Sequence, residues 1–415
     1  MFRYPDIDAN ILNMAKEVHN DLKEVFEELD EISQENQFRV LDAFRKMRVS
    51  EACFNSSTGY GYGESGREVL EGVYSRVFGC EDALVRSQIT CGTAAIYLAL
   101  SANLLAGDEI LFVSGKPYDS LEMAVGITPC ALSLAENGVT YKIVDLIDGC
   151  CFDKAAIRAA LNSRTKIAAI QRSKGYKDRK SFTAAEIGEI TKYIKSLRSD
   201  IIVFVDNCYG EFVCTQEPSH YGADLIAGSL IKNPGGGLAP IGGYIAGKHE
   251  LIERCAFRLT APGLGKEVGP SLGTLRSFYQ GLSLAPKVVN QALKTACFTS
   301  LLFKRNGFRV YPDPYEERGC IVQAVDLQTS EKLGAFCSAI QSSSYVDSYV
   351  RPEGWDMPGY RDKVIMASGA FISGSSIELS ADGPMREPYT VFFQGGLTYE
   401  HGRYAVMKAL QAVKD

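Results

Sequence analysis

Two charged residues stand where predicted buried strands of this sequence end. One apolar run, IIVFV, stops at Asp206, and a second, LIAGSLI, stops at Lys232, 26 positions after the aspartate (232 minus 206). Continuous apolar runs of this length are typical of parallel strands that are buried on both faces. Because ligands of open α/β sheets bind at the carboxyl ends of such strands, we expect both side chains to face one site.

A lysine and an aspartate in these positions are the pair that pyridoxal phosphate chemistry requires. The lysine amine condenses with the cofactor aldehyde, and the aspartate keeps the pyridinium nitrogen protonated so that the ring withdraws electrons. The alternative is an ion pair that only closes the sheet edge, which is uncommon for buried charges without a function. Gly235 to Gly237 favour the cofactor because they would let a flat ligand approach the backbone, and Gly242 and Gly243 open a further short strand.

An anion-binding turn is the third part of such a site. The segment from Ala83 to Val113 predicts strand, turn, helix, turn and strand, and Cys91, Gly92 and Thr93 lie where the helix begins. The free amide groups there, with the Thr93 hydroxyl, would bind a phosphate group, although threonine is also a common helix cap. No GxGxxG that opens a helix after a strand and no GxxxxGK[ST] occurs, which disfavours nicotinamide cofactors and P-loop nucleotides.

Further candidate residues lie in loops. Tyr118, in SGKPYDS after the strand ILFV, could lie against a flat ring or be an ordinary turn residue. The loop RSKGYKDRKS follows the strand KIAAIQ, so Arg172 and Ser173 are candidate cofactor or substrate contacts, although a solvated loop is the default for such a charge run. Tyr60 and Tyr62 lie in the glycine-rich stretch NSSTGYGYGESGRE, which we interpret as functional and not merely as a surface loop.

Composition restricts the class of protein. At 415 residues with 46% hydrophobic side chains, the chain is long enough for two domains. The net charge of −6, without a long basic run, disfavours nucleic-acid and membrane partners. Twelve scattered cysteines without CxxC spacing are typical of a reducing compartment, and four separated histidines offer no metal site. With no signal-peptide core and no membrane-length apolar run, we expect a cytoplasmic enzyme for a small molecule.

Alternating helix and strand patterns predict the scaffold. We expect a helix over about 8–48 with a break at Ser33 to Gln37, a helix over 184–197 capped by Thr183, and a long helix from about Pro286 to Asn306 with the proline in its first turn. The fold class is α/β, a doubly wound, mostly parallel sheet with a smaller C-terminal α+β domain. The predicted divisions are an N-terminal helical arm at 1–50, a large domain at 51–295 and a small domain at 296–415.

The motifs together resemble those of a known family. STGYGYGESGRE, CGTAAI, SGKPYDS, QRSKGY, VDNCYGEF, GSLIKNPGGGLAPIGGY and SGSSIELSADGPMREPY resemble fold type I pyridoxal phosphate enzymes of the cystathionine and methionine γ-lyase superfamily. The branch most similar is the one of aluminium-resistance proteins. The resemblance implies that Lys232 forms the internal aldimine, Asp206 pairs with the pyridinium, and Tyr118 stacks on the ring. The phosphate ligands it implies are Cys91, Gly92, Thr93 and Ser229, with Tyr60 and Tyr62 reaching a neighbouring subunit's site.

The sequence departs from better-known members of that superfamily at three places. Ile231 stands where they have a threonine before the lysine, and Tyr62 stands where their tyrosine loop has an arginine, the nearest arginine being Arg67. Their substrate-carboxylate arginine has only Arg386 as a candidate here. We therefore expect phosphate binding to differ in detail.

The predicted activity is carbon–sulfur bond cleavage in a sulfur amino acid, by elimination at Cβ or Cγ. Methionine and cystathionine are both candidate substrates. An aminotransferase needs the same lysine and aspartate, and a cofactor-binding stress protein without turnover is the third alternative. The resemblance also implies a homodimer with shared sites, assembled further into a homotetramer.

Overall fold

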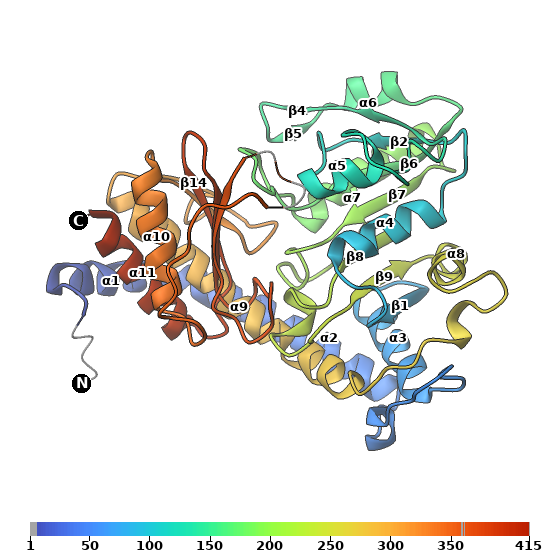
Figure 1. Cartoon of the computed structure of the whole chain (residues 1–415), viewed down its shortest axis with the longest axis horizontal. Helices are drawn as coiled ribbons and strands as arrows, with labels where there is room; N and C mark the ends of the chain where they lie inside the picture. Colours follow the sequence, from blue (N-terminus) through green and yellow to red (C-terminus); the bar gives the residue numbers. More distant parts are fainter. Residues whose placement is uncertain (1–5, 358–359, 361, 415) are drawn as a thin grey trace.

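The computed structural model describes residues 6–357, 360 and 362–414, and it contains two main sheets joined by a long helix (Figure 1). The larger sheet has seven strands. In spatial order they are β1 (Asp82–Arg86), β9 (Gly243–Gly247), β8 (Leu225–Ser229), β7 (Ile202–Asp206), β6 (Thr165–Gln171), β2 (Glu109–Phe112) and β3 (Thr140–Ile143). The five strands from β8 to β3 are parallel, and β9 is antiparallel to both of its neighbours. The predicted mostly parallel sheet is confirmed.

The smaller sheet is antiparallel and lies towards the carboxyl terminus. Its spatial order is β10 (Arg309–Tyr311), β11 (Gln323–Asp326), β14 (Thr390–Gln394), β13 (Ser380–Pro384) and β12 (Val364–Ala367). A separate hairpin pairs β4 (Leu146–Ile147) with β5 (Cys151–Phe152). The sequence patterns predicted β11, β12 and β14, but β10 and β13 were not anticipated.

Helices cover both faces of the large sheet and one face of the small one. The helices are α1 (Ala9–Asp21), α2 (Lys23–Lys46), α3 (Ser65–Val77), α4 (Gly92–Ala102), α5 (Asp119–Val125), α6 (Lys154–Ala160), α7 (Ala184–Leu197), α8 (His249–Leu259), α9 (Leu275–Arg305), α10 (Ser330–Ser342) and α11 (Tyr399–Lys414). The short 3-10 helices are η1 (Glu51–Phe54), η2 (Pro218–Tyr221), η3 (Asn233–Gly235) and η4 (Gly265–Glu267). One core packs α4, α5 and α8 on the large sheet, and another packs α3, α6, α7 and the first half of α9 on its opposite face. The large sheet is therefore doubly wound.

Two helix predictions were wrong in detail. Helix α2 continues through the predicted break because its polar residues are buried: Asn36 Nδ2 donates to the carbonyl oxygens of Phe212 (3.0 Å) and Cys214 (3.1 Å), and Ser33 Oγ donates to that of Pro286 (3.2 Å). Helix α9 begins at Leu275, so Pro286 lies inside it. The helix tolerates the proline because both halves are packed, with residues up to Leu293 in the large-sheet core and residues from Cys297 in the small-sheet core.

The glycines after Lys232 pack against protein and do not line an open edge. A Cβ at Gly235 would collide with the Leu230 carbonyl, and one at Gly236 would collide with the Gly281 carbonyl of α9. The Leu397 side chain fills the space at Gly237 in the same way, so the predicted approach of a ligand at Gly235 to Gly237 is wrong. Gly243 does open β9 as predicted. Within the described residues, none of the helices combines the length and apolarity needed to cross a bilayer.

Candidate active site

Asp206 is the last residue of β7 and is buried, with 4% of its surface exposed. Strand β7 lies between β6 and β8, and Asp206 is level with Gln171 and Ala227 of those strands. Its Oδ1 accepts a hydrogen bond from the backbone N–H of Cys208 at 3.1 Å. Burial raises the pKa of the carboxyl, and the positive charge of Lys232 opposes that shift. The predicted position of Asp206 at the carboxyl edge is confirmed.

Lys232 lies at the same edge of the sheet, but it is not the end of a strand as predicted. Strand β8 ends at Ser229, and the chain turns through Leu230 and Ile231 before Lys232 precedes η3. The amine lies 3.7 Å from the centroid of the Tyr209 ring. Burial disfavours the charged amine, but the acidic groups of Cys208, Tyr209 and Asp206 outweigh it and raise its pKa. Lys232 and Asp206 are thus electrostatically coupled, as their spacing predicted.

Tyr118 closes the site from the side of β2. It precedes α5, its backbone N–H donates to Gln171 Oε1 at 3.1 Å, and its hydroxyl donates to Thr93 Oγ1 at 3.1 Å. Thr93 Oγ1 is also 3.3 Å from Ser120 Oγ. Burial, followed by the Asp206 carboxylate, raises the pKa of the Tyr118 phenol, so the hydroxyl stays protonated and can donate. The structure therefore brings Tyr118 and Thr93 together beside Asp206.

The start of α4 lies next to the end of β8. Cys91 is the residue before the helix, and its Sγ accepts from the Ala94 N–H at 3.4 Å. The N–H groups of Gly92 and Thr93 have no acceptor within the helix because they belong to its first turn. A Cβ at Gly92 would lie 3.2 Å from the Ser229 Cβ, so glycine lets the helix end approach the strand end. Cys91, Gly92, Thr93 and Ser229 are therefore brought together.

Arg172 does not face this site. It is fully buried, and its NH1 donates to Asn207 Oδ1 (2.8 Å) and Glu217 Oε2 (3.0 Å), while its Nε donates to the Phe182 carbonyl (3.2 Å). Its predicted role as a cofactor or substrate contact is wrong, because the side chain is used entirely within the core.

Arg179 of the same loop is the basic residue that lies near Asp206. Its guanidinium donates to the carbonyl oxygens of Ser114 (3.1 Å), Gln171 (2.8 Å) and Ser173, and its positive charge lowers the pKa of Asp206. Ser173 is buried, and its carbonyl also accepts from Gln171 Nε2 at 3.0 Å. The loop thus supports the edge through backbone contacts, which residue types alone did not indicate.

Tyr60 and Tyr62 are exposed on the surface of the chain. Their rings stack with centroids 5.4 Å apart, and 72% and 61% of their surfaces are exposed. Two large aromatic side chains so presented are uncommon unless a partner covers them. The segment that carries them, between α2 and α3, lies at the lower right of Figure 1, away from the small sheet.

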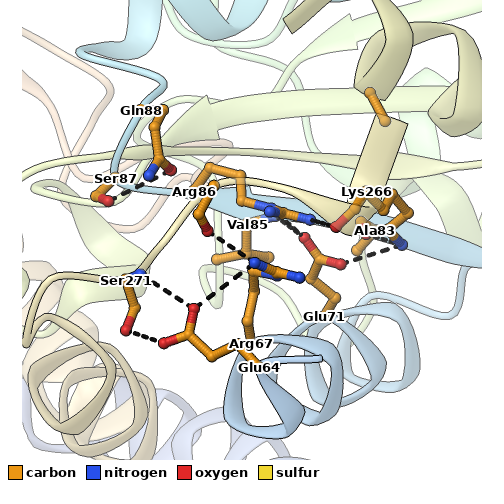
Figure 2. Close-up of polar contacts among 12 residues, drawn as sticks. Glu64, Arg67, Glu71, Ala83, Val85, Arg86, Ser87, Gln88, Lys266 and Ser271 are labelled. Atoms are coloured by element: carbon orange, nitrogen blue, oxygen red, sulfur yellow. Dashed lines mark hydrogen bonds and ion pairs between the residues drawn. The ribbon is translucent and has the colours of Figure 1, made fainter. Parts of the chain in front are cut away.

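A buried ionic network fixes the loop that presents these rings. Arg67 NH1 donates to the carbonyl oxygens of Gly61 and Gly269, each at 2.8 Å, and Figure 2 shows its guanidinium between the carboxylates of Glu64 and Glu71. Glu71 Oε1 accepts from Arg86 Nε at 2.7 Å. Because Arg67 is engaged by its own loop, it does not replace the phosphate-binding arginine that better-known lyases carry there.

Arg386 lies just after β13 and is largely exposed, with its NH1 2.6 Å from Asp362 Oδ2. Its charge affects the pKa of Asp119, the residue after Tyr118. Burial and the Glu122 carboxylate raise the pKa of Asp119, and the positive charge of Arg386 opposes that increase. Arg386 is therefore near the rim of the site, and its carboxylate-binding role stays a prediction.

Lys174 is a buried lysine that the sequence did not single out. Burial lowers the pKa of its amine to about 7. The amine donates to the Tyr311 carbonyl at 3.0 Å and lies 4.0 Å from the centroid of that ring. The pKa of Lys232, in contrast, is raised, and Asp206 is among the groups that raise it.

Sequence reasoning also missed Tyr209 and the small-sheet residues that face Lys232. Tyr209 directly follows the strand-end motif VDNC, so the sequence alone could have predicted that it lies near Asp206. Asp382 and Gln394, on β13 and β14, had no such signal because only tertiary packing brings them near Lys232.

A lysine coupled to a buried aspartate at the carboxyl edge of a doubly wound sheet, with a helix N-terminus beside them, defines the fold type I class of pyridoxal phosphate enzymes. Cystathionine gamma-lyase from Lactobacillus plantarum, solved with L-serine, shares this fold with a TM-score of 0.57 at 15% identity, over 84% of this chain and 86% of that one. The chain belongs to the methionine gamma-lyase family, a family of carbon–sulfur lyases, whose model matches residues 11–414.

Other relatives are similar over nearly the whole chain. The Bacillus subtilis (strain 168) protein YnbB is 50% identical over 401 residues, which cover 96% of this chain and 95% of that protein. The solved structure of a carbon-sulfur lyase involved in aluminum resistance from Clostridium novyi NT has a TM-score of 0.94 at 46% identity, over 97% of this chain and 96% of that one.

Proposed function

We propose that the protein is a pyridoxal-phosphate-dependent carbon–sulfur lyase that acts on a sulfur amino acid by β- or γ-elimination. The observation that carries this proposal is the placement of Asp206 at the end of β7 and of Lys232 just beyond the end of the neighbouring strand β8, with the amine 3.7 Å from the centroid of the Tyr209 ring. When bound, pyridoxal phosphate supplies an aldehyde that captures amines and a ring that withdraws electrons from the α-carbon.

The residues present fit this cofactor. Lys232 would hold its aldehyde carbon and Asp206 its ring nitrogen, and Tyr118 would lie against the ring. The first-turn amides of α4, with Thr93 and Ser229, would hold its phosphate group. The observation that supports this fit is Gly92, whose missing Cβ leaves room between the helix N-terminus and β8.

The chain's own groups then account for the proton movements. With the cofactor bound, the Lys232 amine would be placed to take the proton from the substrate α-carbon once the substrate amine has replaced it. Asp206 would keep the ring nitrogen protonated, so that the ring could withdraw electrons as the α-proton leaves. The bond from sulfur to Cβ or Cγ breaks, sulfur leaves as a thiol with a proton, and hydrolysis releases ammonia and a 2-oxo acid.

We propose further that the active assembly is a homodimer with shared sites, and that two such dimers form a tetramer. The support is the exposed, stacked pair Tyr60 and Tyr62 on a loop fixed by Arg67. These rings would enter the site of a second copy, which buries them.

All twelve cysteines are free thiols among the residues described, which supports a reducing, cytoplasmic location.

A product assay tests the proposed reaction. The protein, with pyridoxal phosphate, is incubated separately with methionine, cystathionine, homocysteine and cysteine, and 2-oxo acid and ammonia are measured. Release of both without an amino acceptor supports a lyase. Release that requires an added 2-oxo acid acceptor would instead identify an aminotransferase. Binding without product would identify a protein that holds the cofactor without turnover.

A further inference from the structure

The small sheet turns a partly polar face towards Lys232. On β13 and β14, Ala381 and Phe393 point into the core formed with α10 and α11. Side chains alternate along a strand, so Asp382 and Gln394 lie on the opposite face with Phe392, which is level with Asp382 in the register. Phe392 packs in a small cluster with aromatic residues of the large domain's loops, so this face is the one that covers the catalytic edge.

Asp382 is bridged to the large domain by a tyrosine. The Tyr176 hydroxyl donates to Asp382 Oδ2, and Gln394 Nε2 donates to Asp382 Oδ1 at 2.9 Å. Tyr176 lies in the loop after β6, and its ring is 5.2 Å from that of Phe392. Asp382 and Gln394 are only 6% and 4% exposed. The carboxylate is therefore held in a fixed position between the two sheets.

The cluster of Asp382 and Gln394 contains a buried hydrogen-bond acceptor that has no donor in the part of the chain that the structure describes. Gln394 Oε1 is buried and has no hydrogen-bond partner among the described residues. The Tyr176 hydroxyl, one amide N–H of Gln394 and a backbone N–H already donate to Asp382, so the acceptor that lacks a donor is Gln394 Oε1. Buried acceptors are rarely left without a donor, and an unpaired amide oxygen beside a carboxylate suits a group that donates N–H bonds.

The cluster also carries negative charge close to the reacting lysine. Burial raises the pKa of Asp382 to about 6, although the hydrogen bonds of Tyr176 and Gln394 and the charge of Lys232 lower it. The carboxyl is consequently mostly ionised at pH 7. Burial raises the pKa values of Tyr209 and Tyr360, and the Asp382 carboxylate raises them further. Both hydroxyl groups therefore stay uncharged.

We propose that Asp382 and Gln394 form a subsite for a distal ammonium group, so that the preferred substrate is a thioether amino acid with an amino group at each end. The inference rests on the proposed function, because it takes the reacting end of the substrate to lie at Lys232. The other end then extends towards the small sheet, where the carboxylate and the amide oxygen accept from the second ammonium. Methionine, whose sulfur carries only a methyl group, leaves Gln394 Oε1 unpaired.

Two ligands that differ in one group test this subsite. Cystathionine carries the distal ammonium, and S-(3-carboxypropyl)-L-cysteine lacks only that group. Their dissociation constants are measured by titration calorimetry on the full chain with pyridoxal phosphate, in a Lys232→Ala background that prevents turnover. We expect cystathionine to bind about ten- to a hundredfold more tightly, the range of a charged hydrogen bond, and Asp382→Asn to bring the ratio close to one.

Asp326→Asn is the matched control. Asp326 is also buried on this face of the sheet, but its oxygens are used by Arg309 NH1 (2.8 Å) and Thr390 Oγ1 (2.6 Å), so the ratio is expected to stay unchanged. A second variant, Gln394→Leu, keeps the carboxylate and removes the unpaired acceptor, and we expect it to lower the ratio by about threefold or more. Gln394→Leu also provides the test of the subsite if Asp382→Asn does not fold.

The outcomes separate the two proposals. A ratio near one in the Lys232→Ala parent, or a ratio that survives both Asp382→Asn and Gln394→Leu, overturns the subsite. The chain with Lys232 intact is assayed in parallel for 2-oxo acid release from both ligands. If neither ligand is cleaved but the binding ratios behave as expected, the lyase proposal fails and the subsite stands.

Discussion

Glu211 offers a quantitative test of the buried charges behind the site. Its side chain is fully buried, its Oε1 accepts from the Tyr244 hydroxyl at 2.9 Å, and its Oε2 has no partner among the described residues. Burial raises the pKa of this carboxyl from 4.5 to about 8. A carboxyl whose pKa is raised by folding contributes stability that is complete below its unfolded pKa and is lost as pH rises through the folded value.

Replacing Glu211 with glutamine removes this titration while keeping the shape of the side chain. Each unit of pKa difference corresponds to about 1.36 kcal/mol, so between pH 5 and pH 8 the wild type should lose on the order of 4 kcal/mol relative to Glu211→Gln. The measurement is the difference in free energy of unfolding between the two proteins, from urea titrations at several pH values in that interval.

The control is Glu253→Gln, which makes the same chemical change at an exposed position of α8. Its difference from the wild type should not vary across the interval. If the curves of the wild type and Glu211→Gln run parallel from pH 5 to pH 8, Glu211 is not held neutral by burial, and the reasoning about charges behind this edge is wrong.

Two further predictions concern activity. Asp206→Asn should retain the cofactor but lose turnover by about a hundredfold or more, because an amide cannot keep the ring nitrogen protonated. Cofactor absorbance measures binding, and initial rates measure turnover. An unchanged rate would show that Asp206 has only a structural role. Mixing inactive Lys232→Ala chains with inactive Tyr60→Ala/Tyr62→Ala chains should restore activity towards about one intact site in two per heterodimer. If mass spectrometry shows that chains have exchanged and no activity returns, the Tyr60 loop serves its own subunit.

The sequence was most informative where a local pattern has one structural solution. The run IIVFVD could only be a buried strand with its charge at the edge, and Asp206 lies there. Thr183 with Glu186 three residues later forms a complete capping box, so α7 begins and ends where the pattern predicted. Gly92 and Thr93 likewise open α4 as expected from a strand, a turn and an apolar helical run.

Prediction was poorer where a residue type serves packing and function equally well. Gly235 to Gly237 were interpreted as room for a ligand, but that room is occupied by Leu230, by the backbone of α9 and by Leu397. Arg172 has the right position in its loop, yet the partner that removes it from the site, Glu217, is distant in sequence. Asp382 comes near Lys232 only because two sheets meet, and no local pattern encodes such a contact.

The central claim is that Lys232 is the residue that holds the cofactor. Borohydride reduction of the protein with pyridoxal phosphate fixes the cofactor covalently to whichever amine holds it, and a peptide map locates the label. The structure supplies a specific competitor in Lys174, whose amine is buried and has a pKa of about 7. The label is expected on the peptide containing Lys232 and on no other; a label on Lys174 would contradict the assignment of the site and the reaction derived from it.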